Sequence, residues 1–132
     1  GLIAFDGRQP VGWVSVGPRV EFGRILRSPV TRLSPEERSD PSVWSVVCFF
    51  IPRTNRGRGI GRFLLDAAVD HARRSGASRV EGYPVDTAGR RVASASVFIG
   101  TRDLFERAGF ERLAEHWKGR PIMTRVLEQG VR

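Results

Sequence analysis

Hydrophobic and polar positions along the chain predict one well-marked strand, helix and strand in succession. Residues 46–51 form an apolar run rich in β-branched and aromatic side chains, which predicts a central strand over 43–51 that is buried on both faces. Apolar residues at helical spacing predict a helix over 60–75, and Gly76 stands where a left-handed C-terminal cap belongs. Residues 79–83 predict the next strand, so this part of the chain favours a parallel crossover.

The rest of the chain predicts shorter strands joined by polar turns. These elements are a strand at 1–5, a tight turn at Asp6-Gly7, a returning strand at 11–16, a surface loop or single helical turn at 28–42, a loop at 87–96, a helix at 101–108 with Thr101 as N-cap, and strands at 110–117 and 121–127. Helices and strands mixed in this order predict an α/β (α+β) domain.

Length and composition fit one folded domain over residues 1–132, with 40% hydrophobic and 27% charged residues. A single cysteine, Cys48, excludes an internal disulfide, and with only two histidines the usual ligand spacings of zinc sites cannot be made. We therefore expect a reducing, cytoplasmic location and no metal. The longest apolar run is far too short to cross a bilayer, so no membrane partner is expected. We also expect that the chain lacks its natural beginning, because it starts at Gly1 inside a strand pattern.

The net charge of the chain bears on whether it binds a polyanion such as a nucleic acid. Lys and Arg number 22 against 14 Asp and Glu, a net charge of +8, and Lys118 is the only lysine. A polyanionic partner is compatible with this excess. Many arginines nevertheless stand beside acids, and no interleaving of aromatic and basic residues of the kind that stacks bases is present. We therefore expect no nucleic-acid partner.

The segment between the predicted central strand and helix carries the most specific chemistry. It consists of Arg56, Gly57, Arg58, Gly59, Ile60, Gly61 and Arg62. Its glycines allow the backbone to approach a ligand closely, and the first amides of the following helix are unpaired and lie at the positive end of the helix dipole. No acid occurs among residues 53–65, while Arg53 adds a fourth arginine. The segment therefore predicts a phosphate site, although it fits neither the Walker nor the dinucleotide pattern.

Arg56-x-x-Gly59-x-Gly61 after a buried strand resembles the acyl-CoA motif Q/R-x-x-G-x-G/A of the GCN5-related N-acetyltransferase (GNAT) superfamily. Residues 104–110, which end in Gly109-Phe110, resemble the late helix of that superfamily. The resemblance implies a mixed, mostly antiparallel sheet with a central splayed parallel strand pair, flanked by helices. The superfamily's first strand and first two helices have no counterpart in this sequence.

The resemblance also implies a reaction. Acetyl-CoA would donate its acetyl group to a primary amine by direct attack, and the acceptor would be a small molecule or a protein. The diphosphate would bind residues 56–62, and the main chain of Phe49, Phe50 and Ile51 would hold the pantetheine arm. Phe105 stands where the superfamily usually has its tyrosine acid, so it could pack against the cofactor but could not protonate a thiolate.

No carboxylate lies on the predicted central strand to act as general base. Glu81 and Tyr83 share a face of the next strand and are our first catalytic candidates, with Asp86 and Glu21 behind them. Each of these residues is also compatible with an ordinary solvated or salt-bridged side chain without a catalytic role. Cys48 is expected to be an inert residue of an apolar strand.

Three functions therefore remain compatible with the sequence. The first is an acetyl-CoA-dependent N-acetyltransferase, the second a non-catalytic acyl-CoA-binding module of the same fold, and the third a basic nucleic-acid-binding domain. The replacement of tyrosine by Phe105 keeps the second function open, and a homodimer is left open as well.

Overall fold

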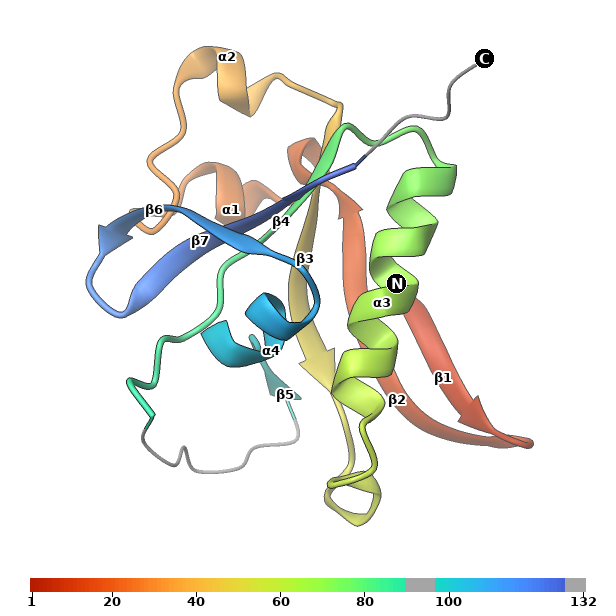
Figure 1. Ribbon diagram of the computed structural model, residues 1–132. Helices are drawn as coiled ribbons and strands as arrows, with labels where there is room; N and C mark the ends of the chain where they lie inside the picture. The colour runs from red at the N-terminus through yellow and green to blue at the C-terminus, as the bar shows by residue number, and fades with distance from the viewer. Residues whose placement is uncertain (90–96, 128–132) are drawn as a thin grey trace.

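The chain folds around one mixed β-sheet (Figure 1). The computed structural model describes residues 1–89 and 97–127. In this described part, six of seven strands follow the order β1-β2-β3-β4-β7-β6, and β5 pairs with β3. The strands are β1 Leu2–Asp6, β2 Gln9–Pro18, β3 Val43–Phe50, β4 Arg79–Gly82, β5 Val97–Phe98, β6 Glu111–Trp117 and β7 Arg120–Val126. The helices are α1 Gly23–Leu26, α2 Pro35–Arg38, α3 Ile60–Arg74 and α4 Arg102–Arg107, with 3₁₀ turns at Arg19–Glu21 and Arg53–Asn55.

The parallel pair at the centre of the sheet is β3 and β4, and all other pairs are antiparallel. Its register runs from Val43 opposite Arg79 to Val46 opposite Gly82, where β4 ends. β3 continues beyond this point and pairs with β5. The two central strands therefore part after Val46 and Gly82, which confirms the predicted mixed sheet with a parallel, splayed centre.

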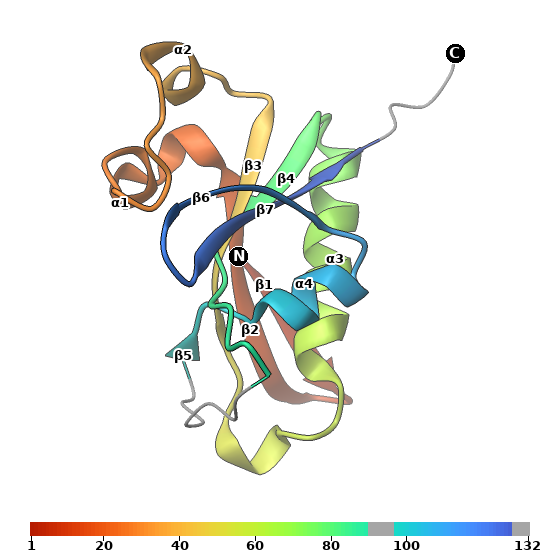
Figure 2. The same ribbon diagram turned by 60° about the vertical axis from the view of Figure 1, so that its left-hand side comes forward.

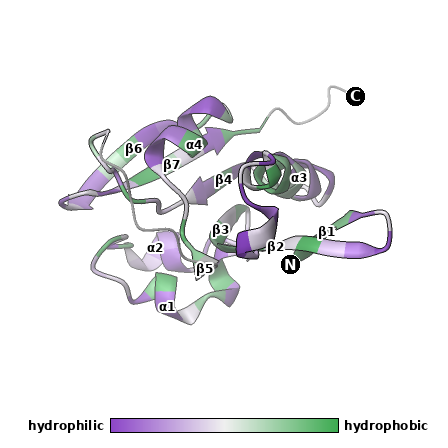
Figure 3. Ribbon diagram, turned by 90° about the horizontal axis from the view of Figure 1, so that it is seen from below, coloured by the Kyte–Doolittle hydropathy of each residue, from purple (hydrophilic) through white to green (hydrophobic). Residues whose placement is uncertain are grey.

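α3 is the longest helix in the described part of the chain, and the apolar face predicted for it packs into the main hydrophobic core. Leu64, Leu65, Ala68, Val69 and Ala72 are all buried in the main core. α3 is amphipathic, as the view along its axis shows (Figure 3). The cap at its end is confirmed, since Gly76 has φ +87° and its amide donates to the carbonyl of Arg73.

The helices lie on two sides of the sheet (Figure 2). α3 and α4 cover one face, where the buried Phe105 of α4 belongs to the same core as the apolar face of α3. The segment with α1 and α2 lies over the other face, where Val30 packs with Tyr83 and Ile122 in a smaller cluster. The sheet therefore carries a separate core on each face.

The short elements agree only in part with the sequence prediction. α2 is the single helical turn expected within residues 28–42, and it begins with a capping box between Ser34 and Glu37. α1 and β5 were not predicted, because four and two residues are too few to produce a periodic pattern. Most of the loop predicted at 87–96 lies outside the described residues.

Candidate functional site

The turn from β3 into α3 has the geometry of an anion site. Gly57 and Gly59 have φ of +74° and +76°, a conformation that glycine adopts without steric cost. Gly59 is the N-cap residue of α3 and, as glycine, has no side chain with which to cap the helix. Within residues 1–89 and 97–127, no side chain is recorded as an acceptor for the first amides of α3, which lie at the positive end of the helix dipole.

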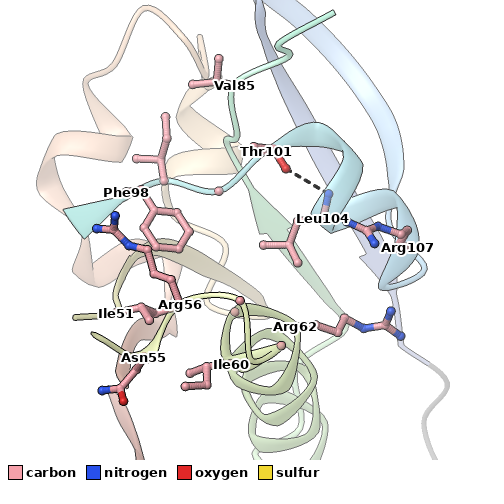
Figure 4. A pocket seen from close by; sticks show the side chains of 15 residues that line it. Ile51, Asn55, Arg56, Ile60, Arg62, Val85, Phe98, Thr101, Leu104 and Arg107 are labelled. Carbon is pink, nitrogen blue, oxygen red and sulfur yellow. Dashed lines mark hydrogen bonds between the residues drawn. The ribbon is translucent and has the colours of Figure 1, made fainter. Parts of the chain in front are cut away.

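A pocket of about 480 Å³ opens beside this turn (Figure 4). It lies between the β3–α3 connection and the segment that runs from β5 into α4. Its apolar lining includes Ile51, Phe98 and Leu104, and no Asp or Glu is among its lining residues in the described part of the chain. Six of the seven residues at 56–62 line it, all except Arg58. The predicted phosphate segment thus forms one wall of an apolar pocket without acidic residues.

The arginines of this segment separate into two groups. Arg56 and Arg62 line the pocket, whereas Arg58 donates to Asp6 at 2.7 Å and to Asn55 at 3.1 Å. Asp6 lies in the β1–β2 hairpin, 52 residues away in the sequence. Arg58 therefore joins the loop to the hairpin. Arg107 and Asn55 also line the pocket and were not predicted as site residues, although Arg107 lies within the late-helix motif at 104–110.

The predicted contacts of the pantetheine arm lie close to the pocket, but only one of these residues lines it. Ile51 is a lining residue, while Phe49 is fully buried and pairs with Phe98 of β5. The rings of Phe49 and Phe98 are stacked, with centroids 5.3 Å apart. Phe50 also pairs with β5 through its main chain. In this structure, β5 thus occupies the edge of β3 at which the arm was expected.

Phe105 is fully buried beneath the pocket rather than on its surface. Its ring stands edge-on to Phe49, with centroids 6.3 Å apart, and packs against two glycines. A Cβ atom added to Gly82 or Gly100 would lie 2.1 Å or 2.7 Å from this ring. The ring thus fills the space beside the end of β4, where a larger residue than glycine does not fit.

Glu81 and Tyr83 are brought together on the opposite side of the sheet from α3, and neither lines the pocket. The Glu81 carboxylate is 2% exposed and accepts from Arg19 at 3.0 Å, Arg79 at 2.5 Å and the Tyr83 hydroxyl at 3.0 Å. The hydroxyls of Tyr83 and Ser45 are 2.6 Å apart. Burial, and then the nearby carboxylate, raise the pKa of Tyr83 far above its usual range. The pair forms a buried network with no direct opening to the pocket.

Neither of the remaining candidates, Asp86 and Glu21, lines the pocket, although Asp86 directly follows the lining residue Val85. Asp86 forms an ion pair with Arg102 at 3.1 Å, and hydrogen bonds from the Ala88 amide and Arg102 lower the pKa of its carboxyl. Cys48 is a half-buried free thiol whose pKa is raised by burial. The described residues contain no group of three His, Cys, Asp or Glu side chains that could hold a metal ion. None of the helices within those residues is both long and apolar enough to span a membrane.

Comparison with known proteins identifies the fold and the family. The sequence model described as Acetyltransferase (GNAT) family matches residues 1–110. A search of curated proteins gave no match. Similar solved structures include a ribosomal-protein-alanine N-acetyltransferase from Brucella melitensis, with 22% identity, a TM-score of 0.59, and coverage of 95% of this chain and 67% of that chain.

Two further structures were solved with a cofactor. The aminoglycoside acetyltransferase AAC(6')-Ib, in complex with coenzyme A, has 20% identity and a TM-score of 0.61 over 94% of this chain and 64% of its own. The protein yncA from Salmonella typhimurium, solved with acetyl-CoA, has 17% identity and a TM-score of 0.60 over 98% of this chain and 65% of its own. The present chain thus spans about two thirds of each of these three proteins. The structural likeness shows the fold, and the match over residues 1–110 shows that the chain belongs to the GNAT acetyltransferase family.

Proposed function

We propose that this chain is an acetyl-CoA-dependent N-acetyltransferase that binds the cofactor in the pocket beside the β3–α3 turn. The observation that carries the proposal is the turn itself, in which Gly57 and Gly59 adopt positive φ directly before an uncapped helix start. Six of the residues at 56–62 line a pocket without acidic groups. Such a site suits the diphosphate of coenzyme A, since helix-terminal amides and arginines both favour phosphate oxygens.

The residues present fit this cofactor in two respects. Gly57 and Gly59 leave open space above the turn, since an added Cβ at either position would have no atom within 4 Å. The apolar lining by Ile51, Phe98 and Leu104 suits the less polar arm that follows the diphosphate. The cofactor supplies an activated acetyl group, and the protein's part is to hold that group beside a neutral amine.

Glu81 and Tyr83 stay our proposed acid–base residues, with a constraint from their geometry. Glu81 is 2% exposed and already accepts from three donors, so its route to a substrate runs through Tyr83, which is itself 3% exposed and hydrogen-bonded to Ser45. Tyr83→Phe separates a catalytic from a structural role. A catalytic hydroxyl predicts a loss of kcat with KM and melting temperature nearly unchanged, whereas a structural hydroxyl predicts a lower melting temperature with kcat retained.

A second candidate function is a non-catalytic acyl-CoA-binding module. The observation in its favour is the buried Phe105 ring, which offers no hydroxyl where family members usually have a tyrosine. Acetyl-CoA binding without release of free thiol across a panel of small amines and lysine peptides would favour this function. Release of thiol with any amine of the panel would favour the enzyme.

Binding itself is tested by two glycine variants at opposite ends of α3. Gly59 and Gly76 both have positive φ, and an added Cβ at either would be in open space, so Gly59→Asp and Gly76→Asp carry comparable backbone strain. Only Gly59→Asp places a carboxylate at the proposed diphosphate site. We expect Gly59→Asp to abolish measurable acetyl-CoA binding in calorimetric titration and Gly76→Asp to retain it. Equal binding by both variants would refute the proposed site.

A further inference from the structure

Arg62 of α3 and Arg107 of α4 lie near the contact between these two helices, which we call the α3–α4 seam. Leu104 of α4 lies against the start of α3, since a Cβ atom added to Gly61 would be 3.9 Å from its Cδ2. Arg62 directly follows Gly61, and Arg107 follows Leu104 by three positions, which places Leu104 and Arg107 on one face of α4. Both arginines line the pocket, and Figure 4 shows them on the same side of it, away from Arg56. Two arginines from different helices therefore lie at the same rim of the pocket.

Each of these arginines keeps donors that an incoming anion can use. The Arg62 side chain donates through its Nε atom to both carboxylate oxygens of Asp66, at 3.0 and 3.1 Å. It makes no other side-chain hydrogen bond in the described part of the chain. Arg107 forms an ion pair with Asp103 at 2.7 Å through one terminal nitrogen. Exposed ion pairs of this kind, four residues apart on a helix, contribute little to stability and exchange partners easily.

The geometry points to a second anion subsite at this seam, formed by Arg62 and Arg107, which binds a phosphate separate from the one at the β3–α3 turn. The inference rests on the proposed function and deepens it. In coenzyme A, the 3′-phosphate of the ribose is such a second phosphate. Arg107 is then a specificity-determining residue that distinguishes coenzyme A from 3′-dephospho-coenzyme A.

The chain offers a matched control for Arg107. Arg74 forms the same type of exposed helical pair, with Asp70 at 3.0 Å, and its side chain is 70% exposed compared with 69% for Arg107. Arg74 is the last residue of α3, at the end far from the pocket. Arg74→Gln therefore removes the same charge and the same kind of ion pair without touching the proposed subsite.

The test is calorimetric titration of the full chain with coenzyme A and with 3′-dephospho-coenzyme A at low ionic strength. We expect the unmodified chain to bind coenzyme A about tenfold more tightly than the dephospho form, a typical effect of charge-assisted contacts to one phosphate. Arg107→Gln should lower the affinity for coenzyme A about fivefold to tenfold and leave the affinity for the dephospho form unchanged. Arg74→Gln should change neither affinity.

Each other outcome has a distinct meaning. Equal affinity of the unmodified chain for the two ligands would overturn the subsite and leave the proposed function standing, while binding of neither ligand would overturn both. Weaker binding of both ligands by Arg107→Gln would show a general effect on the pocket and also overturn the subsite. If Arg107→Gln fails to fold, as judged by its melting curve, Arg62→Gln replaces it with the same expected selectivity.

Discussion

Replacement of Glu81 by glutamine tests the buried network most directly. Arg19 and Glu81 are 1% and 2% exposed, so their charges depend on each other rather than on water. Glutamine keeps the size of the side chain and one acceptor oxygen, but it leaves the Arg19 charge buried without a carboxylate. The Nε atom of Arg19 already has no hydrogen-bond partner among the described residues, and its Nη2 reaches only the carbonyl of Glu37.

The size of the effect follows from this burial. Removal of one partner from a buried ion pair costs about 3–5 kcal/mol, against a total stability of about 5–15 kcal/mol for a small domain. For a chain of this length, each kcal/mol lowers the melting temperature by about 4 °C, so Glu81→Gln should melt about 12–20 °C below the unmodified chain. Urea unfolding should show the same loss of free energy with an unchanged m-value.

Two further variants isolate the ion pair from other effects. Asp70→Asn removes an exposed pair with Arg74 and should cost about 0.5 kcal/mol or less. The double variant Arg19→Met, Glu81→Leu replaces both charges with apolar side chains and should recover most of the loss. A cost below about 1 kcal/mol for Glu81→Gln would refute the argument, because it would mean that water reaches the pair.

Three other changes have clear expected results. Gly82→Ala places a Cβ atom 2.1 Å from the ring of Phe105 and should destabilise the fold by at least about 1–3 kcal/mol in urea unfolding; a neutral result would show that the ring can move aside. Thr101→Ala removes the side-chain acceptor of the Leu104 amide and should cost about 0.5–2 kcal/mol in the same assay, whereas no change would mean that this cap is not used. Burial raises the pKa of the Cys48 thiol, so less thiolate is present at neutral pH. Alkylation of Cys48 by iodoacetamide should therefore be much slower in the folded chain than in urea, and equal rates would contradict the burial of the thiol.

The parts of the fold that the sequence predicts are those set by local pattern. The helix over 60–75 and its cap at Gly76 depend on neighbouring residues, and the structure has α3 at Ile60–Arg74. Thr101 was predicted as an N-cap, and its side chain accepts from the Leu104 amide. The two central strands were predicted as parallel because a helix lies between them, and their pairing follows from the same rule.

The parts that could not be predicted depend on residues distant in sequence. Arg58 stands among arginines that suggest a phosphate ligand, yet its partner Asp6 comes from the first hairpin. Glu81 was chosen as a base because its strand position is suitable, but its partner Arg19 lies 62 residues away. Pattern and spacing give the face of a strand on which a carboxylate lies. They do not give the charged group from another element that meets it there.

The position of Tyr83 connects the two sides of the molecule. Gly82, the last residue of β4, packs against the Phe105 ring beneath the pocket, while the next residue, Tyr83, lies in the small core under α1 and α2. The central strands part at Gly82, so the two faces of the sheet meet at this point of the chain. On the proposed function, we propose that the amine acceptor approaches from the side of α1 and α2, where Tyr83 is hydrogen-bonded to Glu81. In that arrangement the buried network acts by fixing the position of Tyr83, whose hydroxyl contacts Glu81 and Ser45.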